Sequence, residues 1–225
     1  MNYVLVALLS ASLFLGGCAA NDADNDAESQ AENSTTNEKS EPKSEQKENT
    51  RVVDSPQAPD DSSLTEVGQT FQDADGSIKL KAVSDYNEKT EIGDVELTIS
   101  DVKVMKYEPS PDLIDFFHGY STNEEKFNYV KVRVNVKNTS DETVNFAPVS
   151  LLETSDGEKK GYDDDFYLES LYGDFAPGEE RIGQLGFVLN ETDVENLKSL
   201  TIHTSNVFDE QKETITNSKE IAIPF

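Results

Sequence analysis

The sequence predicts an all-β protein whose folded part is an antiparallel β-sandwich, and three observations lead to this prediction. Residues 129–136 read Tyr-Val-Lys-Val-Arg-Val-Asn-Val, an eight-residue alternation of apolar and polar side chains that is typical of a half-buried strand. Other short alternating segments lie on both sides of it, separated by turn-forming clusters such as Asn-Thr-Ser-Asp at 138–141. None of these segments continues into a long run with the 3.6-residue period of a helix.

The expected strands can be placed in chain order from about residue 76 onward. Two alternating segments, 78–83 and 95–104, precede the clearest strand, and a short apolar segment at 144–146 follows it. A hairpin is expected where residues 150–153 and 159–162 flank a Ser-Asp-Gly-Glu turn. The last three expected strands are 183–189, 200–203 and 220–225. In an antiparallel arrangement, one face of each strand would be apolar and the other would face water.

The N-terminal end carries the pattern of an export signal. Residues 3–15 form a largely apolar run that is too short for a membrane-spanning helix, which needs about 20 residues. The run ends in Leu-Gly-Gly-Cys, and Cys18 is the only cysteine in the chain. This segment resembles a bacterial lipobox. The resemblance implies that residues 1–17 are a signal peptide removed before Cys18, which then carries a diacylglyceryl thioether.

One alternative to the lipoprotein interpretation, and one question about the start of the chain, stay open. An ordinary secretory signal cleaved near Ala19 and Ala20 would discard Cys18. The first three residues, Met-Asn-Tyr, lack the Lys or Arg that signal sequences normally carry there. Either the true start lies upstream of Met1, or the amino terminus alone supplies the positive charge.

Residues 18–70 are expected to form a disordered acidic tether between the lipid and a folded domain at 76–225. Most of this stretch consists of Asn, Asp, Glu, Ser, Thr, Gln, Lys and Pro, with very few large apolar side chains. Such a composition cannot bury enough surface to offset the entropy lost on ordering the chain. The tether would hold the folded domain away from the membrane.

The charge of the chain narrows the classes of partner. Its 45 Asp and Glu against 19 Lys and Arg give a net charge of −26. Nucleic acid is excluded as a partner because its recognition needs basic contacts to phosphates. Anionic lipid headgroups would repel the domain, so only the acyl chains on Cys18 would hold it at the membrane. The acidity fits capture of cations or of a basic partner, and more simply solubility in a salty or alkaline exterior.

Several motifs of the folded part together resemble a known family. The strand at 129–136 runs into the turn at Asn138, a hairpin bearing Asp156-Gly157 follows, and Pro177-Gly178 and a Gly-Phe-Val-Leu strand come later. This order is similar to the small immunoglobulin-like domain of exported Gram-positive lipoproteins known as domain of unknown function 4352, related to telokin-like sandwiches. The resemblance implies an immunoglobulin-like sandwich over 76–225, with no established catalytic residues and no cofactor.

A long excursion at 109–128, where a short loop would suffice, is the candidate for binding a partner. Ser110, Pro111 and Asp112 predict the start of a short helix, and Gly119 predicts its end. Exposed apolar and aromatic side chains on such a loop make good anchors for a protein partner. The alternative is that Phe116 and Phe117 close one end of the sandwich. The partner-binding candidates are Leu113, Ile114, Phe116, Phe117, His118 and Tyr120.

A few other residues are weaker candidates for metal binding or catalysis. Asp163, Asp164 and Asp165 are three successive carboxylates, weak candidates for a hard-cation site and more simply a solvated turn. His118 and His203 are the only histidines, and neither lies in a recognisable hydrolase or zinc-binding pattern. We therefore expect no catalytic residues and no metal cofactor.

These observations predict a non-enzymatic, lipid-anchored binding module on the extracellular face of the cell membrane. Its expected partner is another envelope or extracellular protein. The alternative is a lipoprotein that senses cations or solutes through its acidic surface, and a hydrolase is the third possibility.

Overall fold

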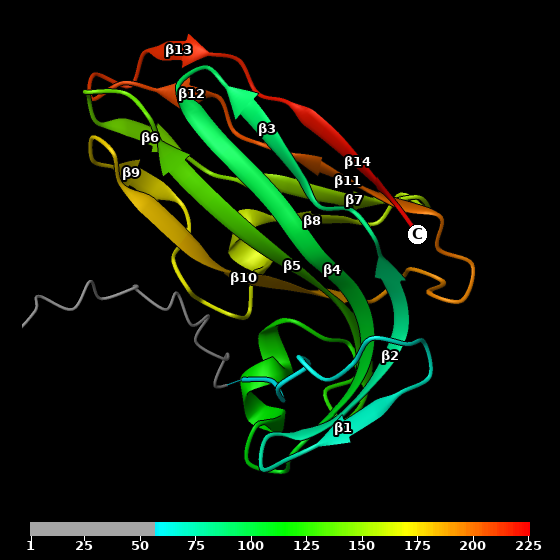
Figure 1. The fold of residues 1–225 in the computed structure, drawn as a ribbon. Helices are drawn as coiled ribbons and strands as arrows, with labels where there is room; N and C mark the ends of the chain where they lie inside the picture. Colours follow the sequence, from blue (N-terminus) through cyan, green and yellow to red (C-terminus); the bar gives the residue numbers. More distant parts are fainter. Residues whose placement is uncertain (1–56) are drawn as a thin grey trace, which may run out of the picture. The chain divides into compact units, whose positions relative to one another are not determined.

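The computed structural model describes residues 57–225, so the predicted signal peptide, Cys18 and most of the predicted tether lie outside the described residues. This part of the chain folds into two β-layers, as Figure 1 shows, and its strand pairings are antiparallel. The predicted all-β fold class is therefore confirmed. Among the described residues, no helix is long and apolar enough to cross a membrane.

The first layer is a six-stranded sheet with the order β1-β2-β4-β5-β10, in which β3 pairs with the N-terminal half of β4. Strands β4 and β5 are the longest of the sheet, at 15 and 12 residues, and their two faces line two separate cores. The strands are β1 (Thr70–Gln72), β2 (Gly76–Ser84), β3 (Glu88–Ile92), β4 (Val95–Pro109), β5 (Phe127–Asn138) and β10 (Glu180–Leu189).

The second layer consists of two four-stranded sheets, ordered β14-β11-β7-β8 and β13-β12-β6-β9. The chain passes from one sheet to the other between β6 and β7, between β8 and β9, between β11 and β12, and between β13 and β14, so the two sheets are successive halves of one layer. Their strands are β6 (Val144–Phe146), β7 (Leu151–Thr154), β8 (Lys159–Gly161), β9 (Gly173–Phe175), β11 (Ser199–His203), β12 (Val207–Phe208), β13 (Thr214–Thr216) and β14 (Glu220–Pro224).

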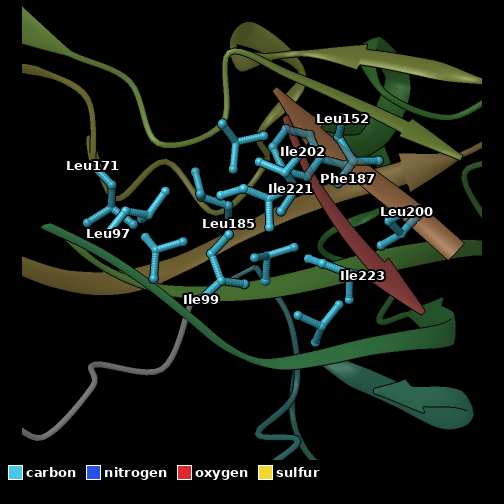
Figure 2. Close-up of a cluster of buried hydrophobic side chains, with 14 of the residues drawn as sticks. Leu97, Ile99, Leu152, Leu171, Leu185, Phe187, Leu200, Ile202, Ile221 and Ile223 are labelled. Atoms are coloured by element: carbon cyan, nitrogen blue, oxygen red, sulfur yellow. The ribbon is translucent and has the colours of Figure 1, made fainter. Parts of the chain in front are cut away.

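The inner core lies between the two layers and is mainly aliphatic. Its side chains come from both layers, and Figure 2 shows leucines and isoleucines of β4 and β11 meeting there. Strand β5 contributes every second residue, which is the face that its alternating sequence predicts. These residues of β5 are Val130, Val132, Val134 and Val136.

The outer core lies on the opposite face of the six-stranded sheet and is mainly aromatic. The alternation along β4 and β5 directs Tyr107 and Tyr129 to this face, away from the valines of the inner core. Phe117 and Phe166 pack over them, with ring centroids 5.6 Å between Tyr107 and Phe117 and 5.3 Å between Tyr129 and Phe166. The sheet is therefore covered on both faces in this half of the domain.

Residues 57–67, which we call the strap, also cover the outer core. Ala58 and Leu64 are buried there, and the buried carboxylate of Asp61 accepts hydrogen bonds from Lys103 Nζ at 2.9 Å and Lys131 Nζ at 2.5 Å. Residues 57–70 were expected to belong to the tether, and their packing on the sheet corrects that boundary. The sequence signal is weak because the segment is held mainly by two buried apolar side chains and the two ion pairs of Asp61.

Buried charges beside the strap are fully paired. Lys131 Nζ also contacts Asp101 Oδ2 at 2.6 Å, and Lys103 Nζ contacts Asp101 Oδ1 at 3.1 Å. Burial alone would raise the pKa of Asp101, but the two ammonium groups hold that pKa below its ordinary value. Because the Asp61 carboxylate contacts the ammonium groups of both Lys103 on β4 and Lys131 on β5, this cluster fixes the strap to those two strands.

The strands that the sequence predicted are all present, and hydrogen bonds close the turns at Asn138 and at Pro177-Gly178. The fully buried Asn138 donates through Nδ2 to the carbonyl of Glu142 at 2.7 Å. Gly178 has φ of 72° in the turn closed by the Glu179 N–H to Ala176 O hydrogen bond, a positive angle that a type II turn requires at this position and that glycine adopts without strain. The prediction missed five short strands, β1, β3, β9, β12 and β13, whose charged or two-to-five-residue segments show no extended alternation.

The helix of the excursion differs from its prediction. It is a 3-10 helix at Ile114–Gly119, and Leu113 precedes it without a side-chain cap. Ser110 instead accepts the Leu113 N–H through its backbone carbonyl at 2.9 Å, which makes residues 110–113 a turn before the helix. The aromatic packing of Phe117 into the outer core sets where this short helix forms.

Candidate functional site

The excursion places most of its apolar side chains in or against the outer core. Phe117 is fully buried, while Leu113, Phe116 and Tyr120 are partly buried and pack on the same cluster. His118 stays exposed and lies 3.2 Å from Glu124, measured from Nδ1 to Oε1. The partner-binding role of this segment stays a prediction, and its buried face supports the alternative in which the aromatic residues close a core.

The three successive aspartates point to different environments. Asp163 is exposed, and Asp164 accepts the Gly161 N–H through Oδ2 at 2.7 Å. Asp165 is buried. Among the described residues, no three His, Cys, Asp or Glu side chains lie close enough to hold a metal ion.

The histidines lie beside carboxylates. His203 is 3.6 Å from Glu153 and 3.5 Å from Glu220, at the end of β11 between its neighbours β7 and β14. Within residues 57–225, no hydrogen bond joins either histidine to a serine or threonine hydroxyl, so no Ser–His or Thr–His pair is assembled there.

Exposed apolar side chains gather on a different segment, residues 162–172, which we call the tyrosine loop. Of the five large hydrophobic residues exposed in the described chain, three belong to it: Tyr162 at 51%, Leu168 at 55% and Tyr172 at 42%. The rings of Tyr162 and Tyr172 meet nearly edge-on, with centroids 5.4 Å apart. These three side chains surround one hollow of about 230 Å³. Such clustering distinguishes this surface from scattered apolar residues.

The base of the tyrosine loop is attached to the free edge of β10. Phe166 donates its N–H to the Gly186 carbonyl at 2.9 Å, and the Asp165 carboxylate accepts the Gly186 N–H at 2.7 Å. A side chain at position 186 would not fit, because a Cβ there would lie 2.6 Å from Cδ1 of Tyr167. The missing side chain of Gly186 therefore lets the loop lie directly on the strand.

A second carboxylate, that of Glu169, also accepts a hydrogen bond from the backbone of β10. Glu169 accepts the Gln184 N–H through Oε2 at 3.0 Å, so Asp165 and Glu169 satisfy two backbone N–H groups of β10 that a further strand would otherwise take. The other oxygen of Glu169, Oε1, is buried and has no hydrogen-bond partner. The loop thus closes an open sheet edge with side chains.

Arg181 holds the other end of the tyrosine loop. Its guanidinium donates to the carbonyl oxygens of Tyr172, at 3.1 Å, and of Asp174, and lies 4.1 Å from the ring centre of Phe175. A planar guanidinium with several donors can fix consecutive carbonyl groups in one geometry. The backbone that carries Tyr172 is therefore held in place, and its exposed ring is presented from a fixed position.

Two residues of the tyrosine loop have left-handed backbone angles without being glycine. Leu168 has φ of 60° and Ser170 has φ of 54°. Such conformations cost on the order of 1–3 kcal/mol each and persist only where the surroundings enforce them, which is common in ligand-binding segments. Here Asp165, Glu169 and Arg181 supply that enforcement.

The carboxylates under the tyrosine loop have perturbed acidity. Burial raises the pKa of Asp165 to about 6, although hydrogen bonds from the backbone of Gly186, Tyr167 and Leu168 oppose the shift. Burial also raises the pKa of Glu169, and the nearby charge of Asp165 adds to that effect. The attachment of the loop therefore depends on two carboxyl groups that are easier to protonate than ordinary ones.

In the sequence, this segment stands out only for the acidity of Asp163, Asp164 and Asp165. The signal that would have identified this surface is the pair Tyr162 and Tyr172 flanking a segment without alternation, together with Leu168. Periodicity does not show which of these side chains is exposed, because exposure here follows from backbone angles that no pattern predicts.

Comparison with other proteins identifies relatives over the described domain and beyond. A family model described as domain of unknown function DUF4352 matches residues 66–214. The chain is 34% identical to the uncharacterized protein YdhF of Bacillus subtilis strain 168, over 98% of this chain and 99% of that protein. It is 25% identical to the SPbeta prophage-derived uncharacterized lipoprotein YonS of the same organism, over 70% of each chain.

Two solved structures share weaker similarity. One is a functionally unknown protein from Listeria monocytogenes EGD-e, with a TM-score of 0.46 and 15% identity over 67% of this chain and 88% of that one. The other is the yjhA protein from Bacillus subtilis, with a TM-score of 0.38 and 13% identity over 61% of this chain and 95% of that one.

Proposed function

This chain belongs to the family defined by domain of unknown function DUF4352, and from that premise we propose that it is a lipid-anchored envelope protein that binds another protein through its tyrosine loop. The proposal includes the immunoglobulin-like assignment of the sandwich and anchoring through Cys18. It includes no catalytic step.

The observation that carries the proposal is the exposure of three apolar side chains on a backbone that is held rigid. Tyr162, Leu168 and Tyr172 surround one hollow, and hydrogen bonds from Arg181 and to Asp165 fix the segment that presents them. Binding costs less free energy when the contact residues are already ordered, and tyrosine supplies large contact area with few rotatable bonds. The arrangement therefore suits recognition of a folded or extended protein surface.

The charge around the loop favours a basic partner. Asp163 lies on the rim of the hollow and Asp164 is next to it in sequence, within a chain whose net charge is −26. A partner that places an apolar side chain in the hollow and a Lys or Arg beside Asp163 would match both features. Complementary charge of this kind accelerates association and disfavours acidic partners.

Lipid anchoring rests on the lipobox-like segment ending in Cys18 and on the relative YonS, whose name describes a lipoprotein. Anchoring would keep the domain at the membrane surface, where an envelope protein is the available partner. Labelling cells with a fatty acid tests this part separately, because replacement of Cys18 by alanine should abolish the label on this protein.

The binding role is tested with the full chain and two matched pairs of substitutions. Leu168→Ser with Tyr172→Ser removes the apolar surface, while Val67→Ser with Ile215→Ser removes apolar residues elsewhere that are somewhat more exposed, at 64% and 51%. We expect the first pair to lose an envelope protein that co-purifies with the wild-type protein and the second pair to retain it. Retention by both pairs, with all variants folded, would contradict the proposal.

A second candidate function, sensing of cations or solutes, is favoured by one separate feature of the domain. A larger cavity with acidic walls lies on the second layer, and its chemistry leads to the inference below.

A further inference from the structure

A cavity of about 620 Å³ lies on the outer face of the sheet β13-β12-β6-β9. Its floor includes the side-by-side strands β12, β6 and β9, on which Phe208 pairs with Asn145 and Asn145 pairs with Asp174. The neighbouring residues Val207 and Phe175 are buried in the inner core, so alternation directs Phe208 and Asp174 outward. The volume lies within the range of small-molecule sites, about 300–1,000 Å³.

The walls of this cavity combine an aromatic ring with an excess of negative charge. Phe208 provides the apolar surface, Asp174, Asp209 and Glu210 provide three carboxylates, and Lys212 provides one positive charge. Asp174 accepts from Asn145 Nδ2 at 2.7 Å through Oδ1, and Asp209 accepts the Glu213 N–H at 2.8 Å, also through Oδ1. Within residues 57–225, no hydrogen bond or ion pair engages the second oxygen of either aspartate or the Glu210 carboxylate.

The spacing of these groups indicates which cation would fit. A divalent metal needs several oxygens converging on one point, and the described residues contain no group of three carboxylate or histidine side chains placed that way. Carboxylates spread around an aromatic floor instead suit a cation that carries hydrocarbon. Its charge would face the rim, its methylene chain would lie on the ring, and a cation over an aromatic face gains further stabilisation.

We propose that this cavity, which we call the sheet cavity, binds a primary ammonium group at the end of an aliphatic chain. That chemistry occurs in free polyamines and in the lysine side chain of a polypeptide, and the test below separates the two sources. The inference rests on the sheet cavity alone and does not depend on the tyrosine loop.

The test is a titration of the full chain, at low ionic strength, with spermidine and separately with a short capped peptide, Gly-Lys-Gly. Amide resonances of Asn145, Asp174 and Phe208 should shift and saturate with at least one of the two probes. A response to spermidine alone identifies a free polyamine as the ligand class, and a response to the peptide alone identifies a lysine within a chain. The absence of saturable shifts with both would overturn the inference.

Three substitutions separate a defined site from general attraction to an acidic protein. Glu210→Gln removes a wall charge and should weaken binding about fivefold, the effect of one charge at about 4 Å in water. Lys212→Ala removes a like charge and should strengthen binding by a similar factor. Glu66→Gln makes the same change as Glu210→Gln on the strap and should leave binding unchanged.

Two results would overturn the inference even if spermidine binds. Equal weakening by Glu66→Gln and Glu210→Gln would mean diffuse attraction to the whole surface. Identical shifts with calcium chloride at matched ionic strength would mean that an inorganic cation fills the site. Disruption of the tyrosine loop by Leu168→Ser with Tyr172→Ser should leave the titration unchanged, so the two proposals can fail separately.

Discussion

The excursion at 109–128 and the tyrosine loop at 162–172 are both aromatic segments on the same half of the domain, yet they use their apolar side chains in opposite ways. The excursion directs Phe117 inward, where it contacts Tyr107 and Phe166. The tyrosine loop buries Phe166 and Tyr167 and leaves Tyr162, Leu168 and Tyr172 exposed. Aromatic content alone therefore does not identify a binding surface, and the backbone that presents each ring decides its role.

The largest expected loss of stability comes from removing the buried aromatic ring of the excursion. Phe117→Ala removes a fully buried ring that packs against Tyr107, Phe127 and Phe166, and we expect it to lower the free energy of unfolding by about 3–5 kcal/mol. Chemical denaturation measures this change. Phe116→Ala, at a partly buried neighbour, should cost clearly less, and equal costs for the two would refute the assignment of Phe117 to the core.

The next largest expected effect is a change of stability with pH, caused by protonation of Asp165. Its pKa is about 6 in the folded protein against an ordinary 3.8, so the folded state binds more protons between these values, and this group adds stability as the pH falls from about 7 to 4. Relative to Asp165→Asn, the wild-type protein should gain on the order of 2–3 kcal/mol over that range. The substitution keeps an oxygen for the Gly186 N–H. The free energy of unfolding is measured against pH for both proteins. Two plots that run parallel across this pH range would refute the raised pKa of Asp165.

A methyl group tests how closely the tyrosine loop lies on β10. Gly186→Ala would place Cβ 2.6 Å from Tyr167 and 2.9 Å from Phe166, and such overpacking should destabilise the domain by about 1–3 kcal/mol. The matched control lies in the excursion: a Cβ at Gly119 would have no atom within 4 Å, so Gly119→Ala should be nearly neutral. Thermal denaturation of both variants compares the two segments directly.

The smallest effect on stability belongs to the exposed residues. Leu168→Ser and Tyr172→Ser remove side chains that face solvent, and each should change the free energy of unfolding by less than about 0.5 kcal/mol. Set beside Phe117→Ala, this result would separate surface residues of the tyrosine loop from core residues by calorimetry. A loss of 2 kcal/mol or more would assign these side chains to the fold instead.

The sequence predicted the long strands well because each contributes one alternating face to a core. The valines of β5 carry that pattern without interruption. The strap was missed because a single leucine, one alanine and the ion pairs of Asp61 bury it, and charged residues ordinarily indicate exposure. The tyrosine loop was missed for a related reason: its geometry depends on tertiary hydrogen bonds from Arg181 and to Asp165, which join residues distant in sequence.

The central claim is that the tyrosine loop contacts another envelope protein. The most direct measurement is photo-crosslinking in intact cells, with a photoreactive amino acid replacing Tyr172 in one variant of the full chain and Ile215 in another. We predict a discrete crosslinked product from position 172 that position 215 does not give, and loss of that product when Leu168→Ser is added. The same products from both positions, or none from position 172 in a folded and correctly located protein, would contradict the claim.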